Sequence, residues 1–492
     1  MTEYEPVIGL EVHAQLQTRS KMYCSCPADY QDAPPNSHVC PICLGLPGTL
    51  PVINREAIQS IIMTGLALHC DIAEHTKFDR KNYPYPDLMK GYQISQYDLP
   101  ICLDGYLDVQ VDGTSRRVGI ERVHMEEDVA KLFHRTDAAT GEAYSLVDVN
   151  RSGVPLMEMV SRPEMRSAEE ARQYLMSYRS ILQYLGVSTG SMEEGSFRCD
   201  ANVSVRPKGT SAFGTKVEVK NMNSFRGVFR AIEFEIERQS KVLDAGERIV
   251  METRGWVEER GVTTSLRSKE EANDYRYFPE PDLPPLNVKR SWVAQIAEML
   301  PEMPEERRAR FANDYALSAY NAAQLTASPR LADYFESVVS ALDRRGADTH
   351  ASAKSAANWM LTDLTSLLNA AGSGIEDSPV SASALAGLIV LIDKGTIGTP
   401  QGKQAIQGMF TTGKSAESVV EELGLVQITD SGEIGAAVAQ AIADNPQAVD
   451  DYMKGKESAA KFLVGHVMKV TRGKANPGIV GGLIVEQLEA MK

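Results

Sequence analysis

The stretch that decides the fold of the first half is Val7-Ile-Gly-Leu-Glu-Val-His-Ala-Gln-Leu16. Alternate side chains of an extended chain point to opposite faces, so this segment is predicted to be a strand. One face would carry only apolar side chains, and the other would carry Glu11, His13 and Gln15. Such a strand has one side for a core and one side for polar chemistry.

Further segments repeat this alternation of apolar residues with carboxylates, histidine, asparagine or lysine. They are residues 122–126, 147–150, 198–206 and 216–220. One such strand is typical of the solvated face of an antiparallel sheet. Five strands with repeated Glu, His, Asp and Asn side chains indicate more, because oxygen ligands suit Mg²⁺ and an added imidazole admits Mn²⁺.

The character of the sequence changes after the proline-rich segment 278–285. From about residue 291 the chain is rich in alanine, with Leu and Met recurring at helical spacing. The sequence therefore predicts an α+β protein with a mixed or antiparallel sheet in residues 1–290. Helical domains would follow in residues 291–402 and 403–492, with a further break near residues 371–379.

Composition excludes several classes of protein. The 492 residues are 43% hydrophobic and 24% charged, as in ordinary globular chains. No apolar stretch is long enough to span a bilayer, and the N-terminus lacks a secretory signal, so we expect a cytosolic protein without a membrane partner. The net charge of −15 does not by itself favour nucleic-acid binding.

Four cysteines form two close pairs, Cys24 with Cys26 and Cys40 with Cys43. Cytosolic thiols stay reduced, so this spacing indicates a structural zinc site in residues 24–43 rather than disulfides. The remaining cysteines lack such spacing and are predicted to lie in the core. They are Cys70, Cys102 and Cys199.

A literal P-loop pattern, Gly408-Met-Phe-Thr-Thr-Gly-Lys-Ser415, is rejected as a phosphate site. A P-loop must follow a buried strand, whereas residues 403–410 are predicted to be helical. Gly413 would end that helix and Ser415 would cap the next one. Nucleotide is therefore expected on the sheet.

The segment 452–476 is locally cationic within an acidic chain. It contains the cations Lys454, Lys456, Lys461, Lys469, Arg472 and Lys474. Charge alone fits a solvated helix face equally well, but such a patch also suits the phosphates of RNA.

Several ordered stretches make the sequence resemble the GatB family of amidotransferase subunits. They include the opening strand, the cysteine pairs, Asp79-Arg-Lys-Asn-Tyr83, Lys90-Gly-Tyr-Gln-Ile-Ser-Gln96, Val123-His-Met-Glu-Glu-Asp128, Asn150-Arg-Ser-Gly-Val-Pro-Leu-Met-Glu158, Glu194-Gly-Ser-Phe-Arg-Cys-Asp200, Val217-Glu-Val-Lys-Asn221, residues 267–283 and Lys474-Ala-Asn-Pro477. The stretches run in order over essentially the whole chain.

The resemblance implies a cradle-like catalytic sheet domain, a helical domain and a helical tail of YqeY type. It also implies a reaction on Glu-tRNA(Gln) or Asp-tRNA(Asn), in which ATP phosphorylates the side-chain carboxylate and ammonia then replaces the phosphate. No Lys-Ser-Ser nucleophile segment of an amidase stands out here. The resemblance names a GatA-type amidase as the ammonia source and a GatC-type small subunit as a third partner.

Site residues are also carried over from the resemblance. Glu11, His13 and Glu126 would hold a divalent metal, with Glu127 as an alternative to Glu126. Asp200, Glu218 and Glu194 are further candidates for metal or ATP contacts, and the lysines would contact phosphate or line the route of ammonia. Those lysines are Lys81, Lys90 and Lys220. The alternative function is a non-catalytic, zinc-containing scaffold that binds tRNA.

Overall fold

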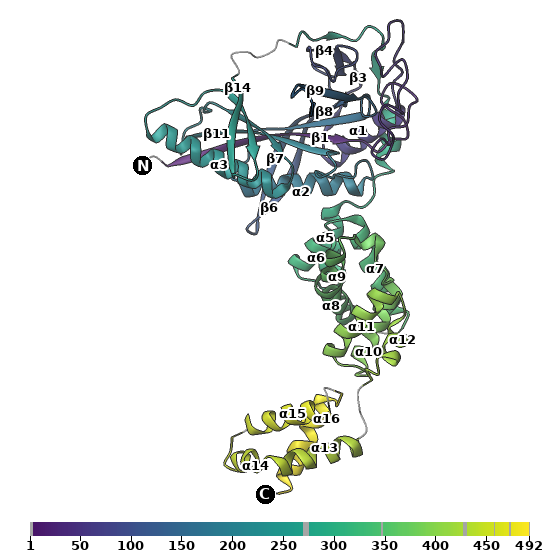
Figure 1. Ribbon diagram of the computed structural model, residues 1–492, viewed down its shortest axis with the longest axis vertical. Coiled ribbons are helices and arrows are strands. Elements are labelled where there is room, and N and C mark those ends of the chain that lie inside the picture. The colour runs from purple at the N-terminus through teal and green to yellow at the C-terminus, as the bar shows by residue number, and fades with distance from the viewer. Residues whose placement is uncertain are drawn as a thin grey trace. The chain divides into compact units, whose positions relative to one another are not determined.

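A computed structural model describes residues 3–268, 275–345, 348–426, 431–456, 458–471 and 474–491. The chain forms two compact units, Met1–Met303 and Pro304–Lys492. Each unit is described by itself below. Figure 1 shows strands in the first unit and helices in the described part of the second.

The first unit is built on a nine-stranded sheet of order β14-β13-β12-β11-β1-β10-β7-β6-β2. Its strands are β1 Tyr4–Gln15, β2 Asp71–Ile72, β6 Cys102–Val111, β7 Thr114–Glu127, β10 Pro155–Ser161, β11 Phe197–Pro207, β12 Val217–Met222, β13 Glu252–Val257 and β14 Val262–Ser268. Neighbours are antiparallel except β12 and β13, which are parallel. The mixed sheet expected from the sequence is therefore confirmed.

The deciding stretch forms β1 near the centre of this sheet. Its apolar residues from Ile8 to Ala14 are fully or almost fully buried. Helices α1 Arg55–Ala67, α2 Ala168–Tyr184 and α3 Phe225–Asp244 add side chains to this core. Figure 1 shows α2 and α3 along one side of the sheet, so the polar residues of β1 are left for the other side.

Three smaller sheets complete the first unit. They are β15-β4-β5, with β4 Asp79–Asn82, β5 Tyr92–Ser95 and β15 Phe278–Pro279; β16-β3, with β3 His75–Thr76 and β16 Leu286–Asn287; and β8-β9, with β8 Lys131–Thr136 and β9 Ala143–Asp148. In Figure 1 the labels β3, β4, β8 and β9 lie across the main sheet from α2 and α3.

One of the five predicted polar strands does not join the main sheet. Residues 147–148 end β9 of the separate hairpin, and Asn150 lies in a turn. Their side chains hold a loop, because Asp148 accepts the Asn36 amide at 3.1 Å and Asn150 accepts the His38 amide at 2.8 Å. The prediction that this segment adds to the polar face is wrong.

The rest of the chain is helical from Arg290 onward, as the sequence predicts. The helices are α4 Arg290–Ala297, α5 Pro304–Asp314, α6 Ala319–Leu325, α7 Pro329–Asp343, α8 Thr349–Trp359, η2 Met360–Leu364, α9 Thr365–Ala371, η3 Ile375–Asp377, α10 Ala382–Asp393, α11 Thr399–Thr412, α12 Ala416–Glu422, α13 Ser431–Asp444, α14 Pro446–Met453, α15 Ser458–Val470 and α16 Pro477–Glu489.

The second unit contains two hydrophobic clusters. One runs from Phe311 to Leu425 and the other from Ile434 to Leu488. The boundary expected at residue 403 falls inside α11, whose Ala405 and Ile406 are buried in the first of these clusters. The predicted break at residues 371–379 marks only the end of α9 within that same cluster.

The P-loop-like segment has the structure expected of a helix end. Helix α11 ends at Thr412, and Gly413 adopts a φ of 68°, in the left-handed region that favours glycine. The Ser415 hydroxyl then accepts the Ser418 amide at the start of α12. The helix end at Gly413 and the cap at Ser415 that the sequence predicts are therefore confirmed. No helix in the described ranges is long and apolar enough to cross a membrane.

Candidate functional site

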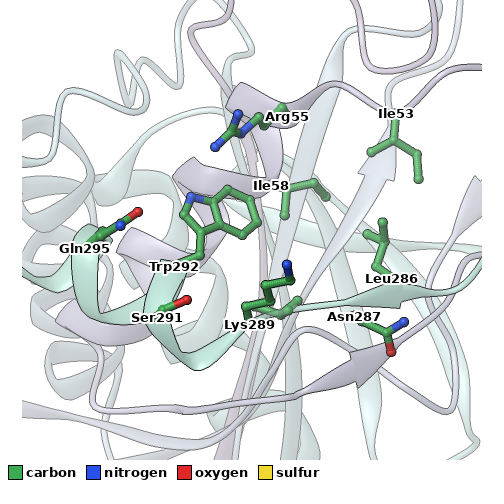
Figure 2. A pocket seen from close by; sticks show the side chains of 10 residues that line it. Ile53, Arg55, Ile58, Leu286, Asn287, Lys289, Ser291, Trp292 and Gln295 are labelled. Atoms are coloured by element: carbon green, nitrogen blue, oxygen red, sulfur yellow. The ribbon is translucent and has the colours of Figure 1, made fainter.

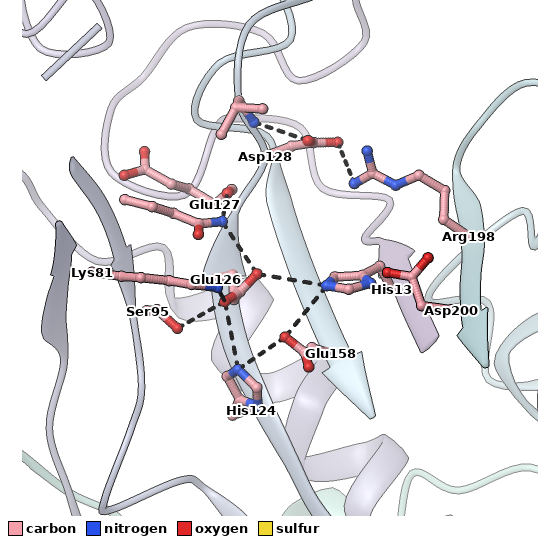
Figure 3. A network of polar contacts seen from close by, with 12 residues as sticks. His13, Lys81, Ser95, His124, Glu126, Glu127, Asp128, Glu158, Arg198 and Asp200 are labelled. Carbon is pink, nitrogen blue, oxygen red and sulfur yellow. Dashed lines mark hydrogen bonds and ion pairs between the residues drawn. The ribbon is translucent and has the colours of Figure 1, made fainter. Parts of the chain in front are cut away.

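A row of three polar residues crosses the centre of the main sheet. His13 on β1, Glu158 on β10 and His124 on β7 are direct cross-strand partners. The Glu158 carboxylate lies 3.3 Å from His13 Nε2 and 3.4 Å from His124 Nε2. Glu126, two residues beyond His124, reaches the same point and lies 3.9 Å from His13. These four side chains form the histidine cluster (Figure 3).

Glu126 is the most heavily contacted member of the histidine cluster. Its carboxylate accepts the Ser95 hydroxyl at 2.9 Å and the Gln93 amide at 3.2 Å, and Lys81 Nζ lies 3.4 Å away. Figure 3 shows Lys81 and His13 approaching Glu126 from opposite sides. Glu126 is 2% exposed, so these contacts replace its hydration almost completely.

The charges of the histidine cluster stabilise one another. Burial acts to raise the pKa of Glu126, but Lys81 and the two histidines hold it well below the usual range. Burial acts in the same way on Glu158, whereas His124 and His13 bring its pKa down to about 2. Both carboxylates are therefore ionised at neutral pH. Burial lowers the pKa of His13, but Glu158 and Glu126 raise it above the usual value overall.

A second group lies on the same face of the sheet but across the opposite edge of β1, toward β11 and β12, and is called the oxygen cluster. It consists of Glu11 on β1, Asp200 on β11 and Glu218 on β12, each with one carboxylate oxygen within 4.8 Å of the oxygens of the other two. Lys220 Nζ lies 3.0 Å from Glu218 and also pairs with Asp200. Glu11 accepts the Asn202 amide at 2.8 Å.

The predicted metal triad is divided between these two clusters. Glu11 and His13 share the polar face of β1, but Glu11 groups with Asp200 and Glu218, whereas His13 groups with Glu126 and Glu158. Positions two residues apart on a strand are separated by about 7 Å. The two clusters are therefore adjacent sites rather than the single site that was expected.

Both clusters have donor sets that fit a divalent cation. The histidine cluster offers His13, Glu126 and Glu158 with ligand atoms within 4.8 Å of one another. This mixed set suits Mn²⁺ as well as Mg²⁺. The oxygen cluster offers carboxylates alone, which suits Mg²⁺.

Glu158 and His124 were not predicted as site residues. Glu158 lies in Pro155–Ser161, where apolar residues occupy both alternations because the strand is covered on both faces. A single carboxylate in the middle of such a strand is costly unless it is paired, and that is the signal that could have identified it. The sequence pattern placed His124 on the polar face of β7 but did not distinguish it from its polar neighbours on that strand.

The other predicted residues have different surroundings. Glu127 faces away from the histidine cluster, pairs with Lys90 and accepts the Ile94 amide at 3.0 Å. Among the described residues, Glu127 is therefore not grouped with His13 and Glu158 as Glu126 is. Glu194 is exposed in the loop before β11 and is not grouped with either cluster of the described residues. Lys81 and Lys220 do reach the two clusters, as the contacts above show.

The cysteine pairs come together as the spacing predicts. The four sulfur atoms of Cys24, Cys26, Cys40 and Cys43 lie within 4.8 Å of one another, and those of Cys40 and Cys43 are 3.9 Å apart. Sulfurs bound tetrahedrally to zinc at about 2.3 Å would be about 3.8 Å apart, so the set fits this metal. Cys24 and Cys43 share a hydrogen bond, which lowers the pKa of the Cys43 thiol to about 4 and raises the pKa of the Cys24 thiol above its usual range. The positions of the four sulfur atoms are therefore what support zinc.

The lysines of the basic segment are exposed on the last helices and loops. Lys454 follows α14, Lys461 and Lys469 lie on α15, and Lys456 pairs with Asp451 at 3.2 Å. Lys474 is exposed just before α16. Arg472 lies outside the described residues.

One apolar pocket of the first unit is separate from this chemistry. It has a volume of about 460 Å³ and is lined by Ile53, Ile58, Leu286 and Trp292, with Arg55 at its rim (Figure 2). None of its lining residues belongs to the histidine, oxygen or cysteine groups. Paired carboxylates on the polar face of the sheet, rather than an apolar pocket, mark the candidate site.

Comparison with known proteins agrees with this division. The family model described as "GatB/GatE catalytic domain" matches residues 6–294, and the one described as "GatB domain" matches residues 333–488. A Dehalococcoides mccartyi protein, named as the B subunit of aspartyl/glutamyl-tRNA(Asn/Gln) amidotransferase, is 55% identical over 99% of this chain and 100% of its own length. Proteins of the same name from Carboxydothermus hydrogenoformans and Moorella thermoacetica are each 53% identical over 99% of this chain, and the alignments cover 99% and 100% of their own lengths. The chain therefore belongs to the GatB family of amidotransferase B subunits.

Proposed function

We propose that this chain activates the side-chain carboxylate of Glu-tRNA(Gln), Asp-tRNA(Asn) or both with ATP, and then converts it into an amide. A carboxylate oxygen attacks the γ-phosphorus of ATP, the bond to the bridging oxygen breaks, and ADP leaves. Ammonia then attacks the acyl carbon, loses a proton, and inorganic phosphate leaves as the C–O bond breaks. A carboxylate is a poor electrophile, and the acyl phosphate supplies the leaving group that it lacks.

The observation that carries this proposal is the pair of clusters on β1. Phosphoryl transfer depends on positioning and on neutralising charge, rather than on covalent help from the protein. Glu126 and Glu158 with His13, and Glu11 with its two neighbouring carboxylates, are the residues that would hold divalent metal. A bound divalent ion would neutralise phosphate oxygens and orient the nucleotide.

Lysines beside the two clusters would contribute positive charge of their own. Lys220 lies beside Asp200 and Glu218, where it would donate to a phosphate oxygen. Lys81 and Lys90 pair with Glu126 and Glu127 next to the histidine cluster. These lysines would contact phosphate or line the path by which ammonia arrives.

Partners follow from the same proposal. Ammonia would come from an amidase subunit of GatA type, with a small subunit of GatC type as a third component, because the relatives are named as B subunits. The exposed lysines after residue 452 would contact tRNA phosphates, which gives binding that depends on salt more than on sequence.

The test is amidation by the chain reconstituted with its partner subunits, each mischarged tRNA and Mg–ATP. Wild type should hydrolyse ATP only when the aminoacyl-tRNA is present. His13→Ala and Glu126→Gln should each lower this turnover by about 100-fold or more. Glu121→Gln is the matched control, because the Glu121 side chain is 53% exposed on the same strand as Glu126. Unchanged turnover in both cluster variants would favour a non-catalytic scaffold.

A further inference from the structure

A chain of tyrosine rings lies beside the histidine cluster and has no part in the reaction described above. Tyr97 and Tyr277 are stacked, with ring centroids 4.3 Å apart and an angle of 10° between planes. Tyr275 meets Tyr277 edge to face at 6.2 Å, and Tyr83 meets Tyr275 in the same way at 5.7 Å. Although Tyr97 packs on Tyr277, it remains 60% exposed.

Strand register places this stack on the side of β4 and β5 that faces Glu126. Gln93 and Ser95 of β5 both donate to Glu126, and Tyr97 comes two residues after Ser95, where the strand has ended. On the other edge, Phe278 pairs with Arg80, so Tyr277 comes next to Lys81, whose ammonium contacts Glu126. The stacked rings therefore border the carboxylates from the small sheet.

Electrostatics agree with this placement. Burial raises the pKa of Tyr277 to about 12, and the charges of Glu126 and Glu158 add to that rise while Lys81 opposes it. Lys81 Nζ also lies 5.4 Å from the centre of the Tyr275 ring. The phenol of Tyr277 is thus close enough to sense the cluster that would hold metal and phosphate.

The segments that carry the two rings are held in place by specific contacts. The Tyr97 amide donates to Asp79 at 3.0 Å, and Asp79 is also paired with Lys77. Arg276, between Tyr275 and Tyr277, adopts a φ of 42°. Its carbonyl accepts a hydrogen bond from the side-chain Nδ2 of Asn82 at 2.9 Å. A left-handed non-glycine residue is costly, and such strain is often stored at ligand sites.

We propose that Tyr97 and Tyr277 form a stacking platform for an adenine base. This rests on the proposed function, in which ATP and the 3′ end of tRNA, which also terminates in adenosine, must both reach the histidine cluster. An aromatic face held in advance binds a planar base with little loss of side-chain freedom. Exposure is not particular to Tyr97, but a second ring stacked on it beside the carboxylates is.

The test compares ligands with and without the base on the reconstituted complex. Tyr97→Leu removes the planar ring but keeps an apolar side chain, and Tyr97→Phe keeps the ring. If the rings stack on adenine, Tyr97→Leu should weaken the binding of either ATP or tRNA by about fivefold or more, whereas Tyr97→Phe should bind both with nearly wild-type affinity. Tyr320→Leu, at a residue 71% exposed on α6, is the matched control.

Two pairs of probes distinguish the source of the base. Weaker binding of Mg–ATP with unchanged binding of magnesium tripolyphosphate would assign the platform to ATP. Weaker binding of tRNA ending in CCA, with unchanged binding of the same tRNA ending in CC, would assign it to the terminal adenosine. Either result supports the platform.

The proposal is overturned if Tyr97→Leu binds both ATP and tRNA with unchanged affinity. It is also overturned if the variant loses as much affinity for tripolyphosphate as for ATP. Photolabelling of the wild-type complex with 8-azido-ATP and with a tRNA ending in 8-azidoadenosine is independent of any variant. Label on Tyr97 or Tyr277 supports the platform, and label confined to other peptides counts against it. Failure of the wild-type complex to amidate tRNA would contradict the proposed function. The amidation assay is independent of the binding and labelling assays that test the platform.

Discussion

Replacing Glu158 with glutamine should damage the histidine cluster without changing its shape. Glu158 lies between His13 at 3.3 Å and His124 at 3.4 Å, and its side chain is 9% exposed. Glutamine keeps the volume but removes the charge that both imidazoles contact. The variant therefore isolates the electrostatic contribution of a residue that sequence reasoning did not select.

The size of the effect follows from the pKa of Glu158, which lies at about 2 against an ordinary value of 4.5. A depressed carboxylate pKa stabilises the fold at pH values above the unfolded pKa, and the contribution is lost as pH falls through the folded value. At about 1.4 kcal/mol per pKa unit, the ionised form contributes on the order of 3 kcal/mol at pH 7. Glu158→Gln should lose most of this.

The assay is urea unfolding of the metal-free chain in EDTA, followed by fluorescence at pH 7 and at pH 4. The difference between wild type and Glu158→Gln should be about 3 kcal/mol at pH 7 and smaller at pH 4, because unfolded Glu158 is then partly protonated. In a parallel Mn²⁺ titration, the variant should bind at least about tenfold more weakly.

Glu121→Gln is the control for this series, because that side chain is 53% exposed and pairs with Arg122 at 2.8 Å rather than with the histidine cluster. Its stability should stay within about 0.5 kcal/mol of wild type. The reasoning is refuted if Glu158→Gln matches wild type in both unfolding free energy at pH 7 and Mn²⁺ affinity.

Three other changes have distinct expected outcomes. Cys43→Ser should abolish stoichiometric zinc, measured by atomic absorption, and full retention of zinc would contradict the tetrahedral site. Lys220→Met should raise the KM for ATP by about tenfold through loss of a charge-assisted hydrogen bond, and an unchanged KM would remove Lys220 from the phosphate site. Lys461→Ala with Lys469→Ala should raise the KM for aminoacyl-tRNA and lower its salt dependence by about one unit of slope or more, with the KM for ATP unchanged. Equal effects on the two substrates would count against a role in RNA binding.

Much of the first unit could be predicted because strand alternation is a local signal. The pattern of Val7–Leu16 is enough to orient β1, and the same reasoning correctly identified β7, β11 and β12. It failed for Asp148 and Asn150, because a polar side chain that caps a loop alternates in the same way as one on a sheet face. Only the hydrogen bonds to the backbone of residues 36–38 distinguish the two cases.

The candidate site was harder to predict because it depends on which strands become neighbours. His13, Glu158 and His124 meet only because β1, β10 and β7 are adjacent in the sheet, although Glu158 is far from His13 in sequence. The single triad of Glu11, His13 and Glu126 ignored that order. Glu11 is on the same face as His13, but its carboxylate partners come from β11 and β12.

Domain boundaries in the helical half could not be predicted from local sequence patterns either. A glycine such as Gly372 or Gly413 ends a helix whether or not the core continues beyond it. The first helical cluster therefore extends past both positions to Leu425. Which helices share a core is decided by long-range packing, and the composition of a single segment does not reveal it.

The most direct test of the central claim follows the oxygen atoms of the substrate. Aminoacyl-tRNA labelled with ¹⁸O in the side-chain carboxylate is given to the reconstituted complex with Mg–ATP and ammonia, and the released inorganic phosphate is examined by mass spectrometry. Activation by phosphorylation predicts one ¹⁸O atom in each phosphate formed with amide, and loss of that product in Glu126→Gln. Unlabelled phosphate accompanying normal amide formation would contradict the account.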